Sequence, residues 1–165
     1  ISNDEILSRV RYMAKSLDCK WIFLDHLSIL VSGQDEGDER KSIDVLMTKL
    51  RSLVEQTGVG LLLVSHLRRP AGDAGHENGK EVTLSHLRGS ASIAHLSDSV
   101  IALERNQQAE DDVASNTTTI RILKNRYTGD TGIATHLFYD KESGRMKEID
   151  NPYEVDNNDG EEITF

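Results

Sequence analysis

The sequence has little of several features that define broad protein classes. It contains one cysteine, Cys19, so no disulfide can form within the chain, and a reducing compartment is the expected setting. Its apolar runs fall far short of the roughly 18 residues that a membrane-spanning helix needs. The first residues are polar and charged, unlike a signal peptide. We therefore expect no membrane partner and a cytoplasmic location.

A phosphate-binding loop is also missing, although two apolar runs end as they do in nucleotide-hydrolysing proteins. The pattern G-x-x-x-x-G-K-[ST], whose backbone N–H groups cradle phosphates, does not occur. The nearest segment, residues 74–81, has alanine for the first glycine and glutamate for Ser/Thr. Because the chain starts with Ile1 rather than methionine, we expect a piece of a nucleotide-binding protein whose phosphate loop lies upstream or in a neighbouring subunit.

The net charge of −9 is unevenly distributed. Residues 148–165 contain seven acidic residues and no basic one, which leaves 21 acidic and 19 basic residues in 1–147, a net charge of −2. The body of the chain can therefore carry a local basic lining for nucleic acid. We expect one domain over 1–148 and an acidic, disordered tail over 149–165.

Helical and strand-like segments alternate along the chain. Helical periodicity predicts helices over 3–17, 38–56 and roughly 83–97. Ser2 and Glu5 form a capping box, and Gly58 ends the second helix. Apolar runs predict strands over 20–25, 59–65, 99–104, 117–123 and 133–139. The alternation indicates an α/β fold with a mostly parallel sheet and helices on both faces.

Connecting segments are predicted from glycine, proline and charge. Residues 68–82 are charged and carry Pro70 with three glycines, which predicts a mobile surface loop. A turn over 128–132 separates the last two predicted strands, and a hairpin turn over 141–144 follows.

Two polar side chains follow the first two predicted strands. Asp25 ends the first strand, and His66 follows the second. Ligands of open α/β sheets bind at the carboxyl ends of strands, where a carboxylate can hold magnesium beside phosphates and a polar residue can sense the γ-phosphate. The alternatives are an acid that caps the next turn and a buried histidine bonded to the backbone.

Basic residues gather after the second predicted strand. Arg68, Arg69 and Lys80 lie in the predicted loop, and Arg88 with Gly89 lies in the helix after it. Such cations can hold a nucleic-acid backbone without reading its sequence. A solvated surface loop is the alternative.

A second pair of cations lies at the end of the strand 117–123. Lys124 and Arg126 are two residues apart, so in an extended segment they project to the same side. They could reach a phosphate on a neighbouring subunit as an arginine finger does. Charges that keep an exposed edge strand from aggregating are the alternative.

Several long segments resemble the helicase domain of the phage replicative primase–helicases, which are related to mitochondrial Twinkle and the DnaB-like hexameric helicases. The strings are WIFLDHLSILVS, DERKSIDVLMTKL, LLLVSHLRRP, LRGSASIAHLSDSVIALERNQQ and ILKNRYTGDTGIA. The resemblance covers about residues 5–148. It implies a partial RecA-like P-loop NTPase core without the Walker A half. It also implies NTP-driven movement along single-stranded DNA within a hexamer, with Mg²⁺ and an NTP (ATP or dTTP) as cofactors.

The resemblance implies roles for residues of the nucleotide site. Asp25 is similar to the Walker B aspartate that works with magnesium, and His66 to the histidine that couples the γ-phosphate to the first DNA-binding loop. Lys124 and Arg126 resemble the cations that reach the adjacent subunit's site, with Arg126 as the finger.

Further roles implied by the resemblance concern the nucleotide base and the DNA. Arg105 and Tyr139 resemble the pair that sandwiches the base. The basic residues at 68, 69 and 80 would belong to the first DNA-binding loop, and Arg88 with Gly89 to the second.

The acidic tail fits the same family. Its members end in an acidic segment with a terminal aromatic that contacts the replicative DNA polymerase, and here residues 149–165 end in Phe165. A terminal aromatic can fill a pocket while acids meet a basic patch; a solubilising tail is the alternative. The cytoplasm of an infected bacterium is the implied location. The rival functions are another RecA-class DNA-dependent ATPase and an inactive fragment that only binds a polymerase.

Overall fold

The computed structural model describes residues 2–27, 36–68, 75–89 and 91–153, which form two compact units. The N-terminal unit comprises residues 1–69 and 83–100, and the C-terminal unit comprises residues 70–82 and 101–165. Among the described residues, no helix is long and apolar enough to cross a membrane.

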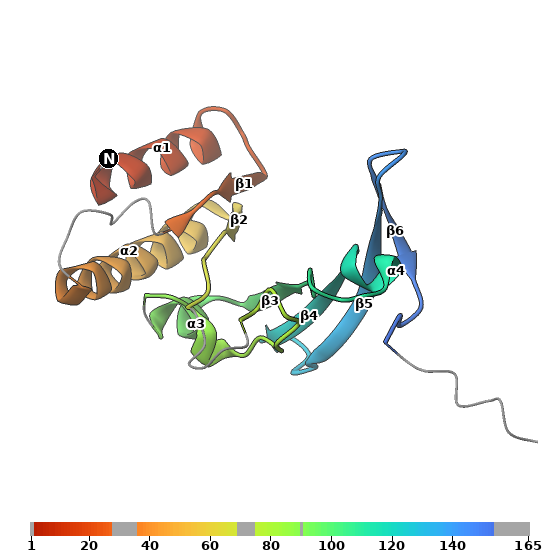
Figure 1. The fold of residues 1–165 in the computed structure, drawn as a ribbon. Helices are drawn as coiled ribbons and strands as arrows, with labels where there is room; N and C mark the ends of the chain where they lie inside the picture. Colours follow the sequence, from red (N-terminus) through yellow and green to blue (C-terminus); the bar gives the residue numbers. More distant parts are fainter. Residues whose placement is uncertain (1, 28–35, 69–74, 90, 154–165) are drawn as a thin grey trace, which may run out of the picture. The chain divides into compact units, whose positions relative to one another are not determined.

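The N-terminal unit is built on a two-stranded parallel sheet (Figure 1). Its main elements are α1 (Asn3–Lys15), β1 (Trp21–Leu24), α2 (Glu36–Thr57) and β2 (Gly60–Leu63). The two predicted helices and the first two predicted strands are confirmed, as is the parallel pairing, which joins Trp21 to Gly60 and Leu24 to Leu63.

The predicted Ser2 N-cap and the helix end at Gly58 are confirmed, whereas the Glu5 carboxylate of the predicted capping box pairs with Arg9 Nη2 at 2.6 Å. The Ser2 hydroxyl accepts a hydrogen bond from the Glu5 N–H at 3.2 Å, and this bond starts α1. Gly58 lies just after α2 with φ of +71°, and its N–H donates to the Val54 carbonyl at 2.8 Å. A left-handed residue at this position ends a helix at little cost only when it is glycine.

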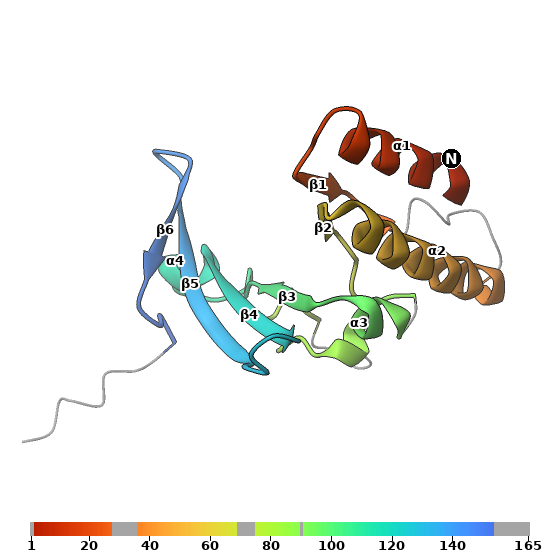
Figure 2. The ribbon, with the colours of Figure 1, turned by 180° about the vertical axis from the view of Figure 1, so that it is seen from behind.

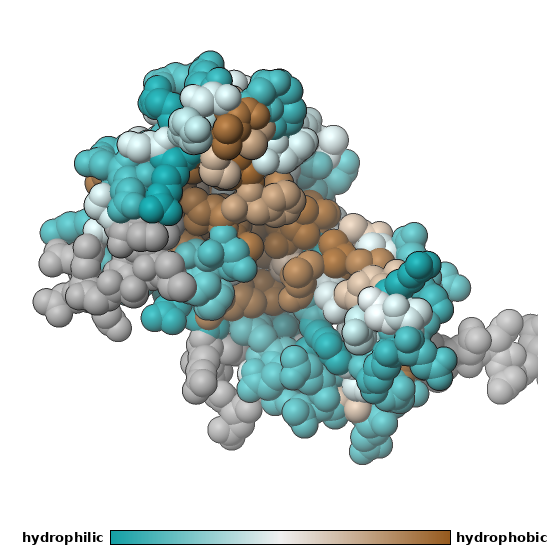
Figure 3. Space-filling view, turned by 90° about the horizontal axis from the view of Figure 1, so that it is seen from above, coloured by the Kyte–Doolittle hydropathy of each residue, from teal (hydrophilic) through white to brown (hydrophobic). Residues whose placement is uncertain are grey.

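One face of the parallel sheet is covered and the other is exposed. Ile22 and Leu61, paired in register, pack with α1 and α2. On the opposite face Trp21 and Phe23 are 67% and 71% exposed. One view of the molecular surface accordingly has an apolar area near its centre (Figure 3). The expectation of helices on both faces is therefore wrong for the residues that the structure describes.

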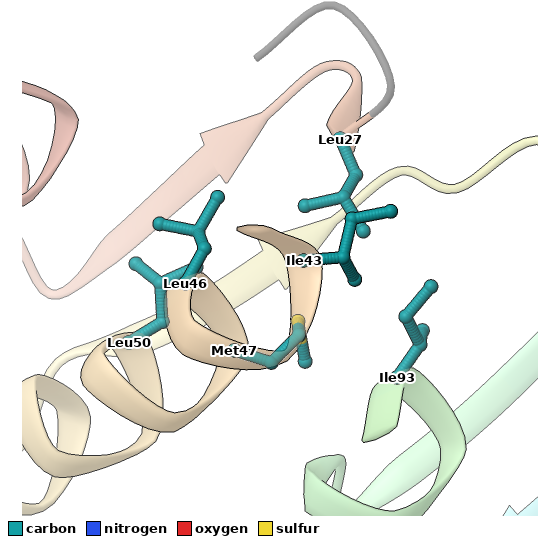
Figure 4. Close-up of a cluster of buried hydrophobic side chains, with 6 residues drawn as sticks. All are labelled: Leu27, Ile43, Leu46, Met47, Leu50 and Ile93. Carbon is teal, nitrogen blue, oxygen red and sulfur yellow. The ribbon is translucent and has the colours of Figure 1, made fainter. Parts of the chain in front are cut away.

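The core of the N-terminal unit consists of two adjoining clusters, and Leu7 and Leu61 pack against both. In the first, side chains of α2 meet Leu27 after β1 and Ile93 of α3 (Ser92–Leu96) (Figure 4). Its buried members are Leu27, Ile43, Leu46, Met47, Leu50 and Ile93. The second cluster is formed by Ile6, Val10, Ile22, Leu53 and Val59. Full burial of such a side chain stabilises the fold by roughly 1.5–3 kcal/mol, so α2 anchors this unit.

The prediction of one continuous helix over 83–97 is wrong, because the segment between its two ends is not helical. The structure has a short 3₁₀ helix, η2 (Leu84–His86), and a separate helix α3 (Ser92–Leu96). Residues 86–88 instead pair with 66–68, because Arg68 N–H donates to the His86 carbonyl at 2.8 Å and Arg88 N–H donates to the His66 carbonyl at 3.0 Å. Backbone groups used in this way cannot close helical turns.

The C-terminal unit is dominated by antiparallel strands (Figures 1 and 2). The sheet order is β3-β4-β5-β6, and β4/β5 and β5/β6 pair antiparallel. The elements are β3 (Ser99–Glu104), α4 (Asp112–Ser115), β4 (Thr117–Asn125), β5 (Gly132–Asp140) and β6 (Arg145–Ile149). The three strands predicted here are confirmed, whereas α4 and β6 were not predicted. Short turns join β4, β5 and β6, which fits the antiparallel pairing of these three strands.

The predicted hairpin turn over 141–144 joins β5 to β6. The Asp140 carboxylate accepts hydrogen bonds from Lys147 Nζ at 2.7 Å and from the Glu142 N–H at 3.0 Å. These bonds, that of Lys147 above all, hold the pKa of Asp140 well below its usual value. Gly144 completes the turn with φ of +66°.

Leu46→Ala should lower the free energy of unfolding of the N-terminal unit by about 2–5 kcal/mol, because Leu46 is 0% exposed and its truncation leaves a cavity. Urea unfolding followed by helical circular dichroism measures the change. Its neighbour Val45 is 48% exposed on the same helix, so Val45→Ala is the matched control. Equal effects of the two substitutions would contradict this assignment of the core.

Candidate functional site

Asp25 and His66 lie beyond the carboxyl ends of the paired strands β1 and β2. Asp25 follows β1 directly, and His66 comes shortly after β2. The pairing continues past both strand ends, since Val64 N–H donates to the Leu24 carbonyl and Leu27 N–H donates to the Val64 carbonyl, both at 2.9 Å. The two predicted residues are therefore held at the edge where α/β sheets bind ligands.

A second histidine, which the sequence analysis missed, stacks on His66. The ring centroids of His26 and His66 are 4.0 Å apart with an interplanar angle of 29°. His26 is joined to Asp25 by a cis peptide bond, and its Nδ1 atom is buried without a hydrogen-bond partner among the described residues. The signal was present in the sequence, because histidine follows the polar residue that ends each of the two apolar runs.

Backbone hydrogen bonds bring His66 together with two of the predicted DNA-binding residues. The His66 carbonyl accepts from the Arg88 N–H at 3.0 Å, and Leu67 forms an antiparallel bridge with Leu87. Arg68 is held by the same short ladder. A displacement of the chain at His66 would therefore be transmitted to both basic segments.

The backbone next to this ladder adopts a conformation at residue 89 that favours glycine. The φ of Gly89 is +108°, and a Cβ placed on it would lie 2.5 Å from the Cδ1 atom of Ile43. Its carbonyl accepts a hydrogen bond from Arg40 Nε at 3.4 Å. The left-handed conformation disfavours a larger residue, and a Cβ would also have to displace the end of the buried Ile43 side chain, so glycine is favoured at this position.

A cavity of about 620 Å³ opens beside the ladder, within the N-terminal unit. Its walls are largely apolar, while arginine and histidine side chains also line it. The lining residues are Arg40, Asp44, Arg68, Leu84, Ser85, Leu87, Ala91, Ser92, His95 and Leu96.

In the C-terminal unit, Arg105 and Tyr139 are bonded to the same residue. Arg105 Nη2 donates to the Asn116 Oδ1 atom at 3.1 Å, and the Tyr139 N–H donates to the Asn116 carbonyl at 2.9 Å. The two residues predicted to bind the nucleotide base, 34 positions apart, are thus brought to one anchor.

Lys124 and Arg126 occupy different kinds of backbone. Lys124 lies on β4, but Arg126 is the first residue of the following turn. The prediction that strand alternation aligns the two side chains is therefore wrong. Asn125 organises the turn, because its Oδ1 accepts from the Tyr127 N–H at 3.1 Å and its Nδ2 donates to the Thr128 Oγ1 at 2.8 Å.

The described part of the predicted loop, residues 75–82, is docked rather than mobile. Asn78 bridges to Asn106, and the Gln107 N–H donates to the Glu77 carbonyl at 3.0 Å. Lys80 is exposed within this docked segment. Arg69 and the rest of the loop, 70–74, lie outside the described residues.

A largely buried ion pair fixes the end of this segment. Arg121 Nε lies 2.8 Å from the Glu104 Oε1 atom, with side chains 17% and 10% exposed. The same Glu104 oxygen accepts from the Val82 N–H at 2.8 Å, and Arg121 also lies 3.3 Å from a carboxylate oxygen of Glu81. The hydrogen bond to Glu104 raises the pKa of Arg121 above its usual value, so the guanidinium stays charged.

No cluster of three or more metal-ligating side chains occurs among the described residues. A magnesium ion in a nucleotide site needs no such cluster, because it keeps several waters and binds substrate phosphates with one or two carboxylates. The single carboxylate of Asp25, at the strand edge, fits that requirement.

The fold and these strand ends define a class of protein, the RecA-like α/β proteins. A KaiC-like protein of the archaeon Pyrococcus horikoshii has a similar fold, with a TM-score of 0.61 and 15% identity over 90% of this chain and 57% of that chain.

Sequence comparison gives the family. The family model described as the DnaB-like helicase C terminal domain matches residues 1–148. A DNA helicase/primase of Enterobacteria phage T3 is 46% identical over 144 residues. This chain belongs to the DnaB-like helicase C-terminal domain family. The aligned region is 87% of this chain and 25% of the phage protein, so the chain spans about a quarter of that relative.

Glu104→Gln should lower the stability of the C-terminal unit by about 3 kcal/mol, because it leaves the largely buried Arg121 charge with only the exposed Glu81 carboxylate nearby. Amide hydrogen exchange of β4 reports on this unit specifically. Glu142, an exposed acid in the same unit, supplies the control Glu142→Gln.

The double variant Glu104→Gln/Arg121→Met should recover much of the lost protection, because neither charge then remains buried alone. If the double variant exchanged faster than Glu104→Gln, Arg121 would contribute through other contacts than this pair.

Proposed function

We propose that this chain is the part of a replicative DNA helicase that runs from the Walker B strand to the arginine finger. The parent protein would use NTP hydrolysis to move along single-stranded DNA within a hexameric ring. The observation that carries the proposal is the position of His66. It lies beside the strand end that bears Asp25, and its carbonyl accepts a hydrogen bond from the Arg88 N–H. His66 thus links the sheet edge proposed to bind phosphate with a proposed DNA-binding segment.

The nucleotide is ATP or dTTP, bound with Mg²⁺. Asp25 would hold the ion, which neutralises charge on the phosphates when it is bound. His66 senses the γ-phosphate and carries its presence into the ladder of residues 66–68 and 86–88. The His26 ring, stacked on His66, restricts the orientations that this imidazole can take.

Residues of the C-terminal unit complete a nucleotide site at the subunit boundary. Lys124 and Arg126 reach the phosphates bound by the adjacent subunit, with Arg126 as the finger. Arg105 and Tyr139 enclose the base. Their common bond to Asn116 supports this pairing.

DNA is held by backbone contacts without sequence readout. Arg68, Arg69 and Lys80 contribute from the first DNA-binding loop, and Arg88 from the second. Gly89 has no side chain of its own, so it contributes through its backbone.

The parent protein should unwind forked DNA when NTP and Mg²⁺ are present. Asp25→Asn and Arg126→Ala should each reduce hydrolysis by a factor of about 10³ or more, while Arg126→Ala retains nucleotide binding. Tyr127→Ala, in the same turn and 79% exposed, is the control and should remain active. DNA-stimulated hydrolysis without unwinding would indicate another RecA-class ATPase and would contradict the proposal.

Mixing the two inactive proteins tests action across the boundary. Rings with both kinds of subunit contain some sites with an intact Asp25 and an intact neighbouring Arg126, so hydrolysis should partly return. If no activity returned, Arg126 would act within its own subunit. The isolated chain should show negligible hydrolysis, because its sequence lacks G-x-x-x-x-G-K-[ST].

We also propose that residues 1–148 form the helicase-domain portion and that the acidic tail 149–165 binds the replicative DNA polymerase in the infected bacterial cytoplasm. Residues 154–165 lie outside the described part of the chain. Deleting 150–165 should abolish polymerase binding, measured by surface plasmon resonance, and leave NTP hydrolysis unchanged. Replacing only Phe165 with serine separates the aromatic contribution from the charges. Unchanged binding after the deletion would exclude the tail.

A further inference from the structure

Asn116 lies at the centre of the proposed base-binding site. It is 4% exposed and comes between α4 and β4. Its backbone carbonyl accepts from the Tyr139 N–H at 2.9 Å, and its side-chain oxygen accepts from Arg105 Nη2 at 3.1 Å. A buried polar residue is retained at little cost only when its groups are paired, and here two of the pairs are the proposed base-binding residues.

The side-chain amide of Asn116 has one orientation that satisfies its neighbours. Its Nδ2 donates to the Asp112 carbonyl at 2.8 Å and to the Asp112 Oδ1 atom at 3.0 Å. Turning the amide over would set its NH₂ group against the Arg105 donors and its oxygen against the Asp112 acceptors. The Asn116 oxygen is therefore fixed toward Arg105.

Two acceptors fix the plane of the Arg105 guanidinium. Arg105 Nε donates to the Ser115 carbonyl at 2.7 Å, while Nη2 donates to Asn116. Hydrogen bonds from a guanidinium lie in its plane, so they leave its flat faces available for a ring. Tyr139 is 39% exposed, so its ring remains accessible while its backbone is bonded to Asn116.

The segment that carries Asn116 is itself braced. The Asp111 carboxylate accepts from the Ala114 N–H at 2.7 Å, and the Thr117 hydroxyl donates to the Val113 carbonyl at 2.7 Å. Lys141 Nζ lies 3.2 Å from the Asp112 Oδ1 atom. Asn116 is thus held independently of any nucleotide, which is what a preorganised site requires.

We propose that Asn116 is a positioning residue for the nucleotide base, which sets the plane of Arg105 and the place of Tyr139 so that a base can stack between them. The inference rests on the proposed function and deepens it. Because the stack uses flat faces and no edge of the base is read, the site should accept purine and pyrimidine nucleotides.

The test compares variants of the parent helicase in steady-state NTP hydrolysis. Asn116→Ala and the near-isosteric Asn116→Leu should raise KM for NTP about tenfold, with kcat within about twofold. Thr119→Val is the matched control, because Thr119 is 6% exposed on β4 and its hydroxyl is paired with His136 Nδ1 at 3.0 Å rather than with the segment that carries Asn116. Nucleotide-free DNA binding serves as the check that each variant is folded.

The conservative variant separates positioning from packing. Asn116→Asp keeps an acceptor toward Arg105 but sets a second carboxylate beside Asp112. Positioning predicts a KM nearer to the wild-type value than that of Asn116→Ala, even if the variant is less stable. If Asn116→Asp were no better than Asn116→Ala, or if Thr119→Val raised KM equally, Asn116 would have only a structural role.

Arg105→Ala distinguishes failure of this inference from failure of the proposed function. An unchanged KM in Arg105→Ala would remove the base-binding role on which the inference depends. A raised KM in Arg105→Ala with an unchanged KM in Asn116→Leu would overturn the inference alone.

Discussion

The ion pair between Glu104 and Arg121 is the interaction on which the C-terminal unit depends. It joins the end of β3 to β4, and its carboxylate also accepts from the Val82 N–H. Burial of two charges is costly, and the cost is offset here because each charge has further partners. The ion pair therefore also fixes the position of nearby residues, because Arg105 follows Glu104 directly and Lys124 lies on the same strand as Arg121. The proposed base site, the proposed finger and the end of the first DNA-binding loop therefore share one anchor.

In the N-terminal unit, the main feature is the connection between a strand end and a basic segment. Its parallel pairing continues beyond β1 and β2, so Asp25 and His66 leave the sheet at neighbouring points. The chain then forms a short antiparallel ladder between 66–68 and 86–88. This ladder consists of backbone hydrogen bonds, which are directional and poorly compressible. A shift at His66 would consequently move Arg68 and Arg88 together rather than separately.

Much of this arrangement could be predicted from local sequence, and the failures have identifiable causes. Apolar runs located the strands, and the polar residues after them located Asp25 and His66. The helix predicted over 83–97 was wrong because the backbone of 86–88 pairs with a distant segment and Gly89 adopts φ of +108°, neither of which periodicity detects. α4 has four residues, too few for an apolar pattern, although Asp111 is a good N-cap. Asn116 was missed because its bonds to Arg105 and Tyr139 join residues that are distant in the sequence.

The two proposed arginine functions require different degrees of rigidity, and the structure provides both. A guanidinium that stacks on a base must stay flat, and Arg105 is held by two in-plane acceptors on a braced segment. A finger must approach a phosphate on another subunit and withdraw after hydrolysis. Arg126 accordingly lies in a turn that the neighbouring Asn125 side chain shapes through local bonds. Local bonds can break and re-form within the turn without disturbing β4 or β5, whereas loosening Arg105 would require α4 to move. The proposed base contact and the proposed finger therefore depend on different bonds within one small sheet.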